Sequence, residues 1–288
     1  MAGWFSFELM GATAGDLLAR DAACEWLNAA GCPYDVAVAP PFDGGVDWRS
    51  VDPGDYSHVL FVCGPVGNGE PLSDFVERFE GRRFAGLGVS MLQPLEEFDP
   101  FDFLLERDSS RGAAPDLSLA APSRTVPVVG VALVHRQREY EGAMHEVAHA
   151  AIERLLESRE LAPVRIDTRL DVPNDGGLAS AAAVESVVAR MDAVISTRLH
   201  GGVLALKHGV PPLLVDPIAG GAKIRRQAET LGWPAVVTAD ELDDGRLREL
   251  LDWCLGEDAR ALASECATRG TAELARAGER FAAWVRES

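Results

Sequence analysis

Apolar residues follow two patterns along this chain. Short apolar runs, such as residues 58–64 and 128–134, have the length of buried strands, about four to eight residues. Longer stretches carry apolar residues three or four positions apart, the spacing of a helix with one face on a sheet. The two kinds of stretch alternate from end to end. This alternation predicts an α/β fold with parallel sheets and helical crossovers.

The same pattern predicts the individual elements. In the first half we expect an opening apolar segment at residues 4–11, helices at residues 16–30 and 73–80, and strands at residues 34–39, 58–64, 84–91 and 101–108. In the second half we expect strands at residues 128–134, 164–170, 192–197, 212–216 and 234–237, and helices at residues 141–158, 179–190 and 202–208, from residue 223, and from residue 240 to the end.

A break in the pattern divides the chain. The stretch SLAAPSRTVP, residues 118–127, combines two prolines with small polar residues, which end one element before the next begins. A chain of 288 residues also exceeds what one hydrophobic core usually fills. We therefore expect two α/β lobes, residues 1–123 and residues 124–288. The last helix is a candidate to pack back on the first lobe.

The charge of the chain limits its partners. Forty-five acidic residues stand against 27 basic ones, a formal net charge of −18. A field of this sign repels phosphate backbones and anionic lipid headgroups. Nucleic acid and membrane surfaces are therefore not expected partners, whereas a small anion can bind wherever a few basic side chains converge.

The cysteines and the first residues favour a cytoplasmic protein. Five scattered cysteines without a CxxC pair argue against a disulfide framework and against a thiolate zinc site. Residues 1–20 lack the basic start and the continuous apolar core of a signal peptide, and no apolar run has the length of a membrane span.

The stretch HEVAH, residues 145–149, is spelled like the zinc-binding helix of a metalloprotease. On a helix, His145 and His149 share a face. A third ligand is lacking, because Leu155 lies six residues beyond His149 and Glu185 falls on another predicted helix without a supporting pattern. The expected apolar stripe is Met144, Val147, Ala148, Ala151, Ile152 and Leu155. The histidines then lie on the solvent face, and we expect no metal site.

A more informative stretch is DAVISTRLHGGVLALKHGVPPLLVD, residues 192–216. Arg198 and His200 follow a strand and come directly before Gly201 and Gly202, which open a helix. Ligands of open α/β sheets bind at the carboxyl ends of the strands, and a helix N-terminus favours an anion. Arg198 is suited to a carboxylate or phosphate and His200 to proton transfer, and the glycines allow close backbone approach. In the alternative reading, Arg198 pairs with a carboxylate across the lobe interface and His200 caps a loop.

These residues resemble the signature of the polysaccharide pyruvyl transferase family, an Arg-x-His turn between strand and helix, then Gly-x-Pro, a strand and a lysine. The matching positions are Arg198, His200, Gly209, Pro211 and Lys223. The resemblance continues in the first half, in TAGDLLARDAACEWLNAAG with Asp16, in the glycine turn VLFVCGPVGNG, and in LLERDSS and APDLSLAAP, which supply Arg107, Asp108, Ser110 and Asp116.

The resemblance implies two Rossmann-like lobes facing a cleft, as in GT-B glycosyltransferases, with the acceptor on the first lobe and the donor on the second. It implies phosphoenolpyruvate as co-substrate and no other cofactor. In that chemistry the enol methylene is protonated, two acceptor hydroxyls attack the neighbouring carbon, phosphate leaves, and a pyruvate ketal results. The chain is compact for the family, so the expected acceptor is a small or carrier-linked sugar.

The resemblance also assigns residues. Arg198 and His200 would be catalytic, with His200 either the acid or a phosphate ligand. Donor binding would fall to Arg198, Gly201, Gly202, Lys223 and Arg107, and acceptor binding to Asp16.

Several of these assignments have structural alternatives. Lys223 competes with Arg225 and Arg226, Arg107 suits a structural ion pair, and Asp16 suits a helix cap. Pro65 alters the glycine turn of residues 64–69. A nucleotide-sugar glycosyltransferase of the same fold and a non-catalytic binding member of the family therefore remain alternatives.

Overall fold

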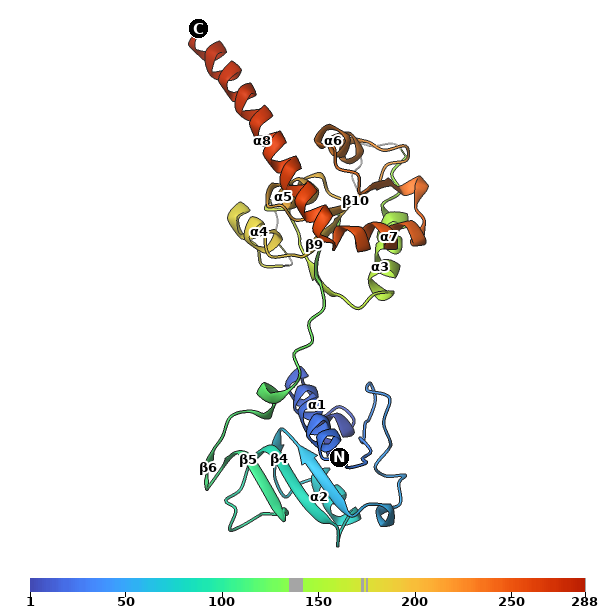
Figure 1. Ribbon diagram of the computed structural model, residues 1–288, viewed down its shortest axis with the longest axis vertical. Helices are drawn as coiled ribbons and strands as arrows, with labels where there is room; N and C mark the ends of the chain where they lie inside the picture. Colours follow the sequence, from blue (N-terminus) through green and yellow to red (C-terminus); the bar gives the residue numbers. More distant parts are fainter. Residues whose placement is uncertain (135–141, 172–173, 175, 288) are drawn as a thin grey trace. The chain divides into compact units, whose positions relative to one another are not determined.

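The computed structural model describes residues 1–134, 142–171, 174 and 176–287 (Figure 1). The chain divides into two compact units, Met1–Arg124 and Thr125–Ser288. The division falls one residue beyond the end of the first lobe expected from the sequence. Each unit has its own sheet and its own hydrophobic core.

The sheet of the first unit is parallel except at one edge. Its order is β1 (Ala2–Gly3), β2 (His58–Val62), β4 (Arg83–Met91), β5 (Phe103–Ser109) and β6 (Gly112–Ala113), with the short β3 (Pro65–Val66) also paired to β4. Only β5 and β6 are antiparallel. Short 3₁₀ turns lie at Trp4–Ser6, Pro53–Asp55 and Leu117–Ala120.

Two helices cover opposite faces of this sheet. Helix α1 (Ala14–Ala29) packs with Val62, whereas α2 (Leu72–Arg78) packs with Phe61. Neighbouring residues on a strand point to opposite faces, so the two helices lie on different sides. The α2 side is rich in aromatic rings, and Phe75 stands among five of them with centroids 5.1–6.3 Å away.

Residues 34–39 do not form the strand that the apolar pattern predicts. One isolated bridge, Ala37 to Val46, is the only ladder contact among these residues. The backbone amides of Ala37 and Ala39 instead donate to the carbonyls of Met1 and Phe5 at 2.8 and 2.9 Å. Two prolines follow directly, and a residue without an N–H cannot extend a ladder. The segment is therefore extended without becoming a strand.

The second unit has a fully parallel sheet. Its order is β11 (Val236–Thr238), β10 (Pro212–Asp216), β9 (Ala193–Ser196), β7 (Val128–Ala132) and β8 (Ala162–Arg165). Its helices are α3 (His145–Glu157), α4 (Ala181–Val188), α5 (Leu199–Lys207), α6 (Lys223–Leu231), α7 (Asp244–Cys254) and α8 (Glu257–Arg286). The expected α/β class with parallel sheets is confirmed.

Helix α8 is the longest element, with 30 residues. Its first turns bury Ala259, Ala263 and Cys266 in the core of the second unit. Farther along, Leu274, Phe281, Trp284 and Val285 are exposed. The expectation that this helix packs back on the first lobe stays a prediction. Among the described residues, no helix has the length and apolar composition needed to cross a membrane.

Helix α3 is turned differently from the sequence expectation. His145 is only 5% exposed, whereas Val147, expected in the core, is 47% exposed. The buried positions are His145, Ala148, Ala151, Ile152, Leu155 and Leu156. These residues keep the helical spacing of three and four. In the first turn, however, the buried residue is His145 and not the expected Val147. The placement of both histidines on a solvent face was therefore wrong for His145.

The orientation of α3 predicts unequal effects of two truncations on one helix. Ile152→Ala removes a fully buried side chain and should lower the free energy of unfolding of the second unit by about 2–5 kcal/mol. Val147→Ala, at an exposed position, should change it by less than about 0.5 kcal/mol. Urea unfolding, followed by hydrogen exchange of peptides from the second unit, measures both. Equal losses would contradict this orientation.

Candidate functional site

The turn after β9 is fixed by two buried hydroxyl side chains. Ser196 Oγ accepts from the Arg198 amide at 3.0 Å and donates to the Arg198 carbonyl oxygen at 2.8 Å, with the Ala132 carbonyl oxygen 3.2 Å away. Thr197 Oγ1 accepts from the Val134 amide at 2.8 Å. The end of β9 is thereby tied to the end of β7, and Arg198 takes the N-cap position of α5.

The Arg198 side chain reaches across β7 toward β8. Its Nε donates to the carbonyl oxygen of Leu133 at 2.9 Å and Nη1 donates to Thr168 Oγ1 at 3.2 Å. Nη2 lies 3.8 Å from the carboxylate of Asp167, in the same unit. The side chain is 13% exposed, and burial lowers the pKa of its guanidinium, which still keeps its charge at neutral pH.

This turn lies at the topological switch point of the second sheet. From β7 the chain runs outward to β8 and then returns to add β9 on the other side of β7. In open parallel sheets, ligands bind outside the carboxyl ends of the strands at the point where the order reverses. Arg198 follows β9 and crosses the end of β7, so it occupies that position.

His200 lies in the first turn of α5 and is exposed. A side chain there is close to the free amides of the helix N-terminus, where an anion is favoured. The structure therefore keeps His200 accessible beside the half-buried Arg198. Its choice between proton donor and phosphate ligand stays a prediction.

Gly201 and Gly202 are buried against the sheet. A Cβ at Gly201 would lie 2.3 Å from Ser196 Oγ, and one at Gly202 would lie 2.4 Å from Leu214 Cδ2. The missing side chains let α5 approach β9 and β10 closely. Helix packing thus already requires both glycines, and a contact between their backbone and a donor stays a prediction.

Lys223 belongs to a different part of the sheet edge. It opens α6, which follows β10, on the side of β9 away from β7. Buried Asp216 holds the preceding loop by accepting from the amides of Ala222 and Arg225 at 2.7 and 3.0 Å. Arg225 pairs with Glu229 and Glu241, at 3.3 Å each. In the order β10-β9-β7-β8, three strand spacings, about 14 Å, separate β10, which α6 follows, from β8, toward which Arg198 reaches.

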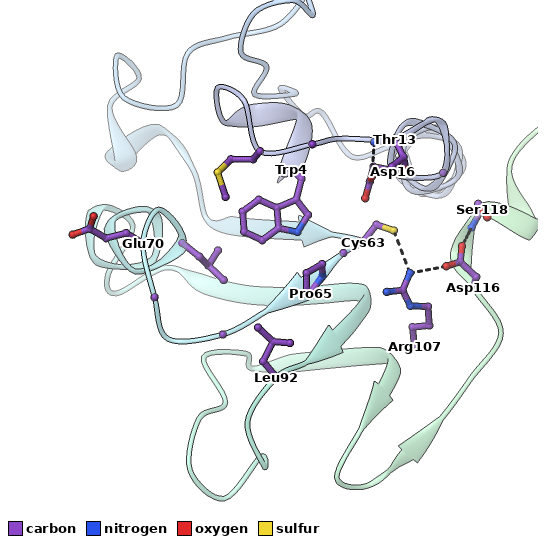
Figure 2. Close-up of a pocket in the computed structure, with 17 residues that line it drawn as sticks. Trp4, Thr13, Asp16, Cys63, Pro65, Glu70, Leu92, Arg107, Asp116 and Ser118 are labelled. Atoms are coloured by element: carbon purple, nitrogen blue, oxygen red, sulfur yellow. Dashed lines mark hydrogen bonds and ion pairs between the residues drawn. The ribbon is translucent and has the colours of Figure 1, made fainter.

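The first unit contains a pocket of about 610 Å³ (Figure 2). Trp4, Leu72 and Leu92 contribute apolar wall, and Asp16 and Arg107 contribute polar wall. Cys63 to Gly69, the altered glycine turn, supplies much of the remaining surface. Five glycines line this pocket, so backbone as well as side chains faces the space.

Arg107 is held by neighbours within this pocket. Nη1 donates to the Asp116 carboxylate at 2.9 Å, and Nη2 and Nε donate to Ser90 Oγ at 2.6 and 3.0 Å. Figure 2 shows the guanidinium between Cys63 and Asp116. Hydrogen bonds from Ser118 and then Arg107 lower the pKa of Asp116. Arg107 therefore has the ion pair that its sequence position suggested, and donor binding by Arg107 stays a prediction.

Asp16 caps the first helix. Its carboxylate accepts from the amide and the hydroxyl of Thr13, both at 2.7 Å, while Thr13 Oγ1 accepts from the Asp16 amide at 3.4 Å. This is a reciprocal capping box. The cap expected from the sequence is confirmed, and the same carboxylate faces the pocket, so its acceptor contact stays a prediction (Figure 2).

Cys63 and Gly64 form an unusual turn at the end of β2. Their φ angles are 64° and 75°, a region that residues with side chains rarely adopt. A Cβ at Gly64 would lie 2.1 Å from the Trp4 ring, so only glycine fits beneath the indole. Burial, followed by the charge of Asp16, raises the pKa of the Cys63 thiol to about 11. The thiol is protonated at neutral pH and is not a nucleophile.

Pro65 fits the altered turn because it opens the short strand β3. A proline can begin an edge strand, where no ladder hydrogen bond is lost. Sequence reasoning did not connect Trp4 or Cys63 with a site. Neither carries a motif, and a contact between residues 60 positions apart leaves no local signal.

The two histidines of HEVAH stack, with ring centroids 6.4 Å apart and an angle of 12° between the planes. Among residues 1–134, 142–171, 174 and 176–287, no group of three or more His, Cys, Asp or Glu side chains is arranged to hold a metal ion.

The capping box predicts a stability effect of Asp16. Asp16→Ala should lower the free energy of unfolding of the first unit by about 1 kcal/mol, because the first turn of α1 loses its reciprocal bonds. Asp21→Ala is the matched control on the same helix, since that carboxylate bonds only to the adjacent Arg20 among the described residues. Unit-specific hydrogen exchange in urea measures both. Equal effects would argue against a structural role for Asp16.

The lowered pKa of Asp116 predicts a pH dependence. A carboxylate with a folded pKa below the unfolded value of about 3.9 stabilises the fold fully above that value. The contribution is lost as the pH falls through the folded pKa. The stability difference between wild type and Asp116→Asn should therefore shrink from pH 6 to pH 3, in urea titrations. Asp43→Asn, at an exposed position, is the matched control for the loss of one carboxylate, and an equal shrinkage there would argue against Asp116 as the cause.

Comparison with known proteins gives a family match and likenesses to solved structures. The family model "Polysaccharide pyruvyl transferase" matches residues 114–217, which include the Arg198 turn. No curated protein matches the sequence. The crystal structure of CalG4, the calicheamicin glycosyltransferase, is similar with a TM-score of 0.38 and 17% identity, over 91% of this chain and 63% of that one. The resemblance noted in the sequence is confirmed over residues 114–217, the segment that matches the family model.

Proposed function

We propose that this protein transfers a pyruvyl group from phosphoenolpyruvate to two hydroxyls of a sugar-containing acceptor. One observation carries the proposal. The segment that matches the family model contains the Arg198–His200 turn, and that turn lies at the switch point of a parallel sheet. Sequence match and ligand-binding position thus coincide in the same residues.

The reaction requires groups that bind an anion and one group that transfers a proton. In the proposed reaction the methylene carbon gains a proton, and the carbon that carried the phosphate gains two bonds to acceptor oxygens. The bond to the phosphate oxygen breaks. Of the two hydroxyl protons, one balances the new methyl group and the other leaves with phosphate. No oxidation takes place, so no redox cofactor is needed.

Arg198 suits the carboxylate or phosphate of the donor. Two of its five N–H groups are used in hydrogen bonds to Leu133 and Thr168, which leaves three within the described structure. A half-buried guanidinium binds an anion more strongly than an exposed one, because less water screens it. The N-terminus of α5 adds partial positive charge on the same side.

His200 suits the proton transfer, because it is exposed and an imidazole can both accept and donate a proton. Lys223 remains a candidate for a second anionic group of the donor, at the neighbouring strand end. We keep the backbone amides of Gly201 and Gly202 and the side chain of Arg107 as further donor contacts to be tested.

The pocket of the first unit suits the acceptor. An indole ring and leucine side chains match the apolar face of a sugar ring, and the carboxylate of Asp16 can accept from hydroxyls. Arg107 is neutralised by Asp116, so the pocket carries no free positive charge among its described side chains. A neutral hydroxylated acceptor group fits this lining better than a phosphorylated one. A cytoplasmic location is part of the same expectation.

The donor assignment predicts a ligand-dependent shift in melting temperature. Phosphoenolpyruvate at about 100 times its Kd should stabilise the wild type by about 2.7 kcal/mol, a rise of several degrees. Arg198→Ala should abolish the rise. Arg198→Lys should keep part of it, because the charge stays while the planar fork is lost. Arg276→Ala, an exposed arginine on α8, is the charge-matched control and should shift like the wild type.

Parallel measurements separate the alternatives. Phosphate release with a panel of neutral sugars tests turnover, and nucleotide-sugars test the glycosyltransferase alternative. Donor binding without phosphate release from any acceptor would favour a binding member of the family. A shift with a nucleotide-sugar and none with phosphoenolpyruvate would overturn the proposal.

A further inference from the structure

The guanidinium of Arg198 is aimed by groups of its own unit. The Leu133 carbonyl oxygen holds Nε at 2.9 Å from the end of β7, and Thr168 Oγ1 holds Nη1 at 3.2 Å from the segment after β8. The Leu133 contact uses a backbone carbonyl oxygen, so it does not depend on which side chain stands at position 133. The Thr168 contact depends on a hydroxyl, so it is the adjustable part of the arrangement.

The backbone of Arg198 is fixed in a second way. Ser196 Oγ bridges the amide and the carbonyl oxygen of Arg198 at 3.0 and 2.8 Å, beneath the first turn of α5. Ser196 is fully buried, and a Cβ on Gly201 would lie 2.3 Å from this same oxygen. The glycine thus leaves the space that the hydroxyl fills.

We infer that Thr168 and Ser196 are positioning residues that hold Arg198 ready for the donor anion. The Thr168 hydroxyl holds the guanidinium of Arg198, and the Ser196 hydroxyl holds its backbone. The inference rests on the proposed function. An arginine side chain has many rotamers, and restricting them before the ligand arrives lowers the entropy lost on binding.

Thr168 offers a test in which shape and hydroxyl are separated. Thr168→Val keeps the side-chain volume and removes the hydroxyl that accepts from Arg198, so the Kd for phosphoenolpyruvate should rise roughly fivefold to tenfold. Thr168→Ser keeps the hydroxyl and should restore the Kd to within about twofold of wild type. Thr271→Val, an exposed threonine on α8, is the matched control and should leave the Kd unchanged. Inorganic phosphate serves as a second probe.

Ser196 requires a variant that repairs the packing. Ser196→Ala leaves an unfilled space and Gly201→Ala adds a clash, so each should lower the melting temperature. In Ser196→Ala with Gly201→Ala, the added methyl group enters the space vacated by Oγ, and its nearest remaining neighbour is the Cβ of Ala132 at 2.9 Å. A structural role alone predicts recovery of both melting temperature and Kd. A positioning role predicts that melting temperature recovers in part while the Kd for phosphoenolpyruvate stays raised.

The outcomes separate this inference from the proposed function. The positioning role is supported if Thr168→Val raises the Kd at an unchanged melting temperature and Thr168→Ser restores the wild-type Kd. An increase in KM for the donor with kcat retained in Thr168→Val would support it as well. If Arg198→Ala weakens binding while Thr168→Val and the double variant bind like wild type, the positioning role is wrong and the proposed function stands. If the wild type binds neither probe, both are wrong.

Discussion

The close approach of α5 to its sheet is the constraint on which the second unit depends. Gly201 and Gly202 face Ser196 and Leu214 at distances that leave no room for a methyl group. Because α5 lies so near, its N-terminus opens at the ends of β9 and β7. A helix held one side chain farther out would place its free amides and Arg198 away from the switch point. Packing and the proposed anion binding therefore rely on the same pair of small residues.

Much of the fold is predictable because the second sheet is buried on both faces. Its strands are continuous apolar runs, and β7, β9 and β10 fall within the predicted ranges. The failures have local causes. Residues 34–39 have the composition of a strand, but their hydrogen bonds go to the backbone around β1, which no periodicity can specify. The strand predicted at residues 164–170 ends at Arg165, because the residues that follow form the loop that meets Arg198.

The candidate site was only partly accessible from the sequence. Arg198 and His200 could be identified because strand, turn and helix are contiguous there. Thr168 could not be, since its hydroxyl meets Arg198 across 30 residues of chain. The face of α3 was misjudged because Val147 was assigned to its apolar stripe, whereas the structure buries His145 and exposes Val147. Motifs identify functional residues that are neighbours in the sequence, whereas a residue such as Thr168 is identified only by its three-dimensional contact.

The pairing of β1 with β2 has a consequence for how the first unit forms. Ala2 lies opposite Phe61, so the first strand of the chain finds its partner only after about sixty residues have been made. Two of the rings around Phe75 also come from distant stretches, Phe7 from 68 positions and Trp48 from 27 positions earlier in the chain. Such high contact order slows folding, because a long loop must close before any of these contacts stabilises it. During synthesis, the rings of Phe7 and Trp48 therefore wait for Phe75 to be made before they can pack against it.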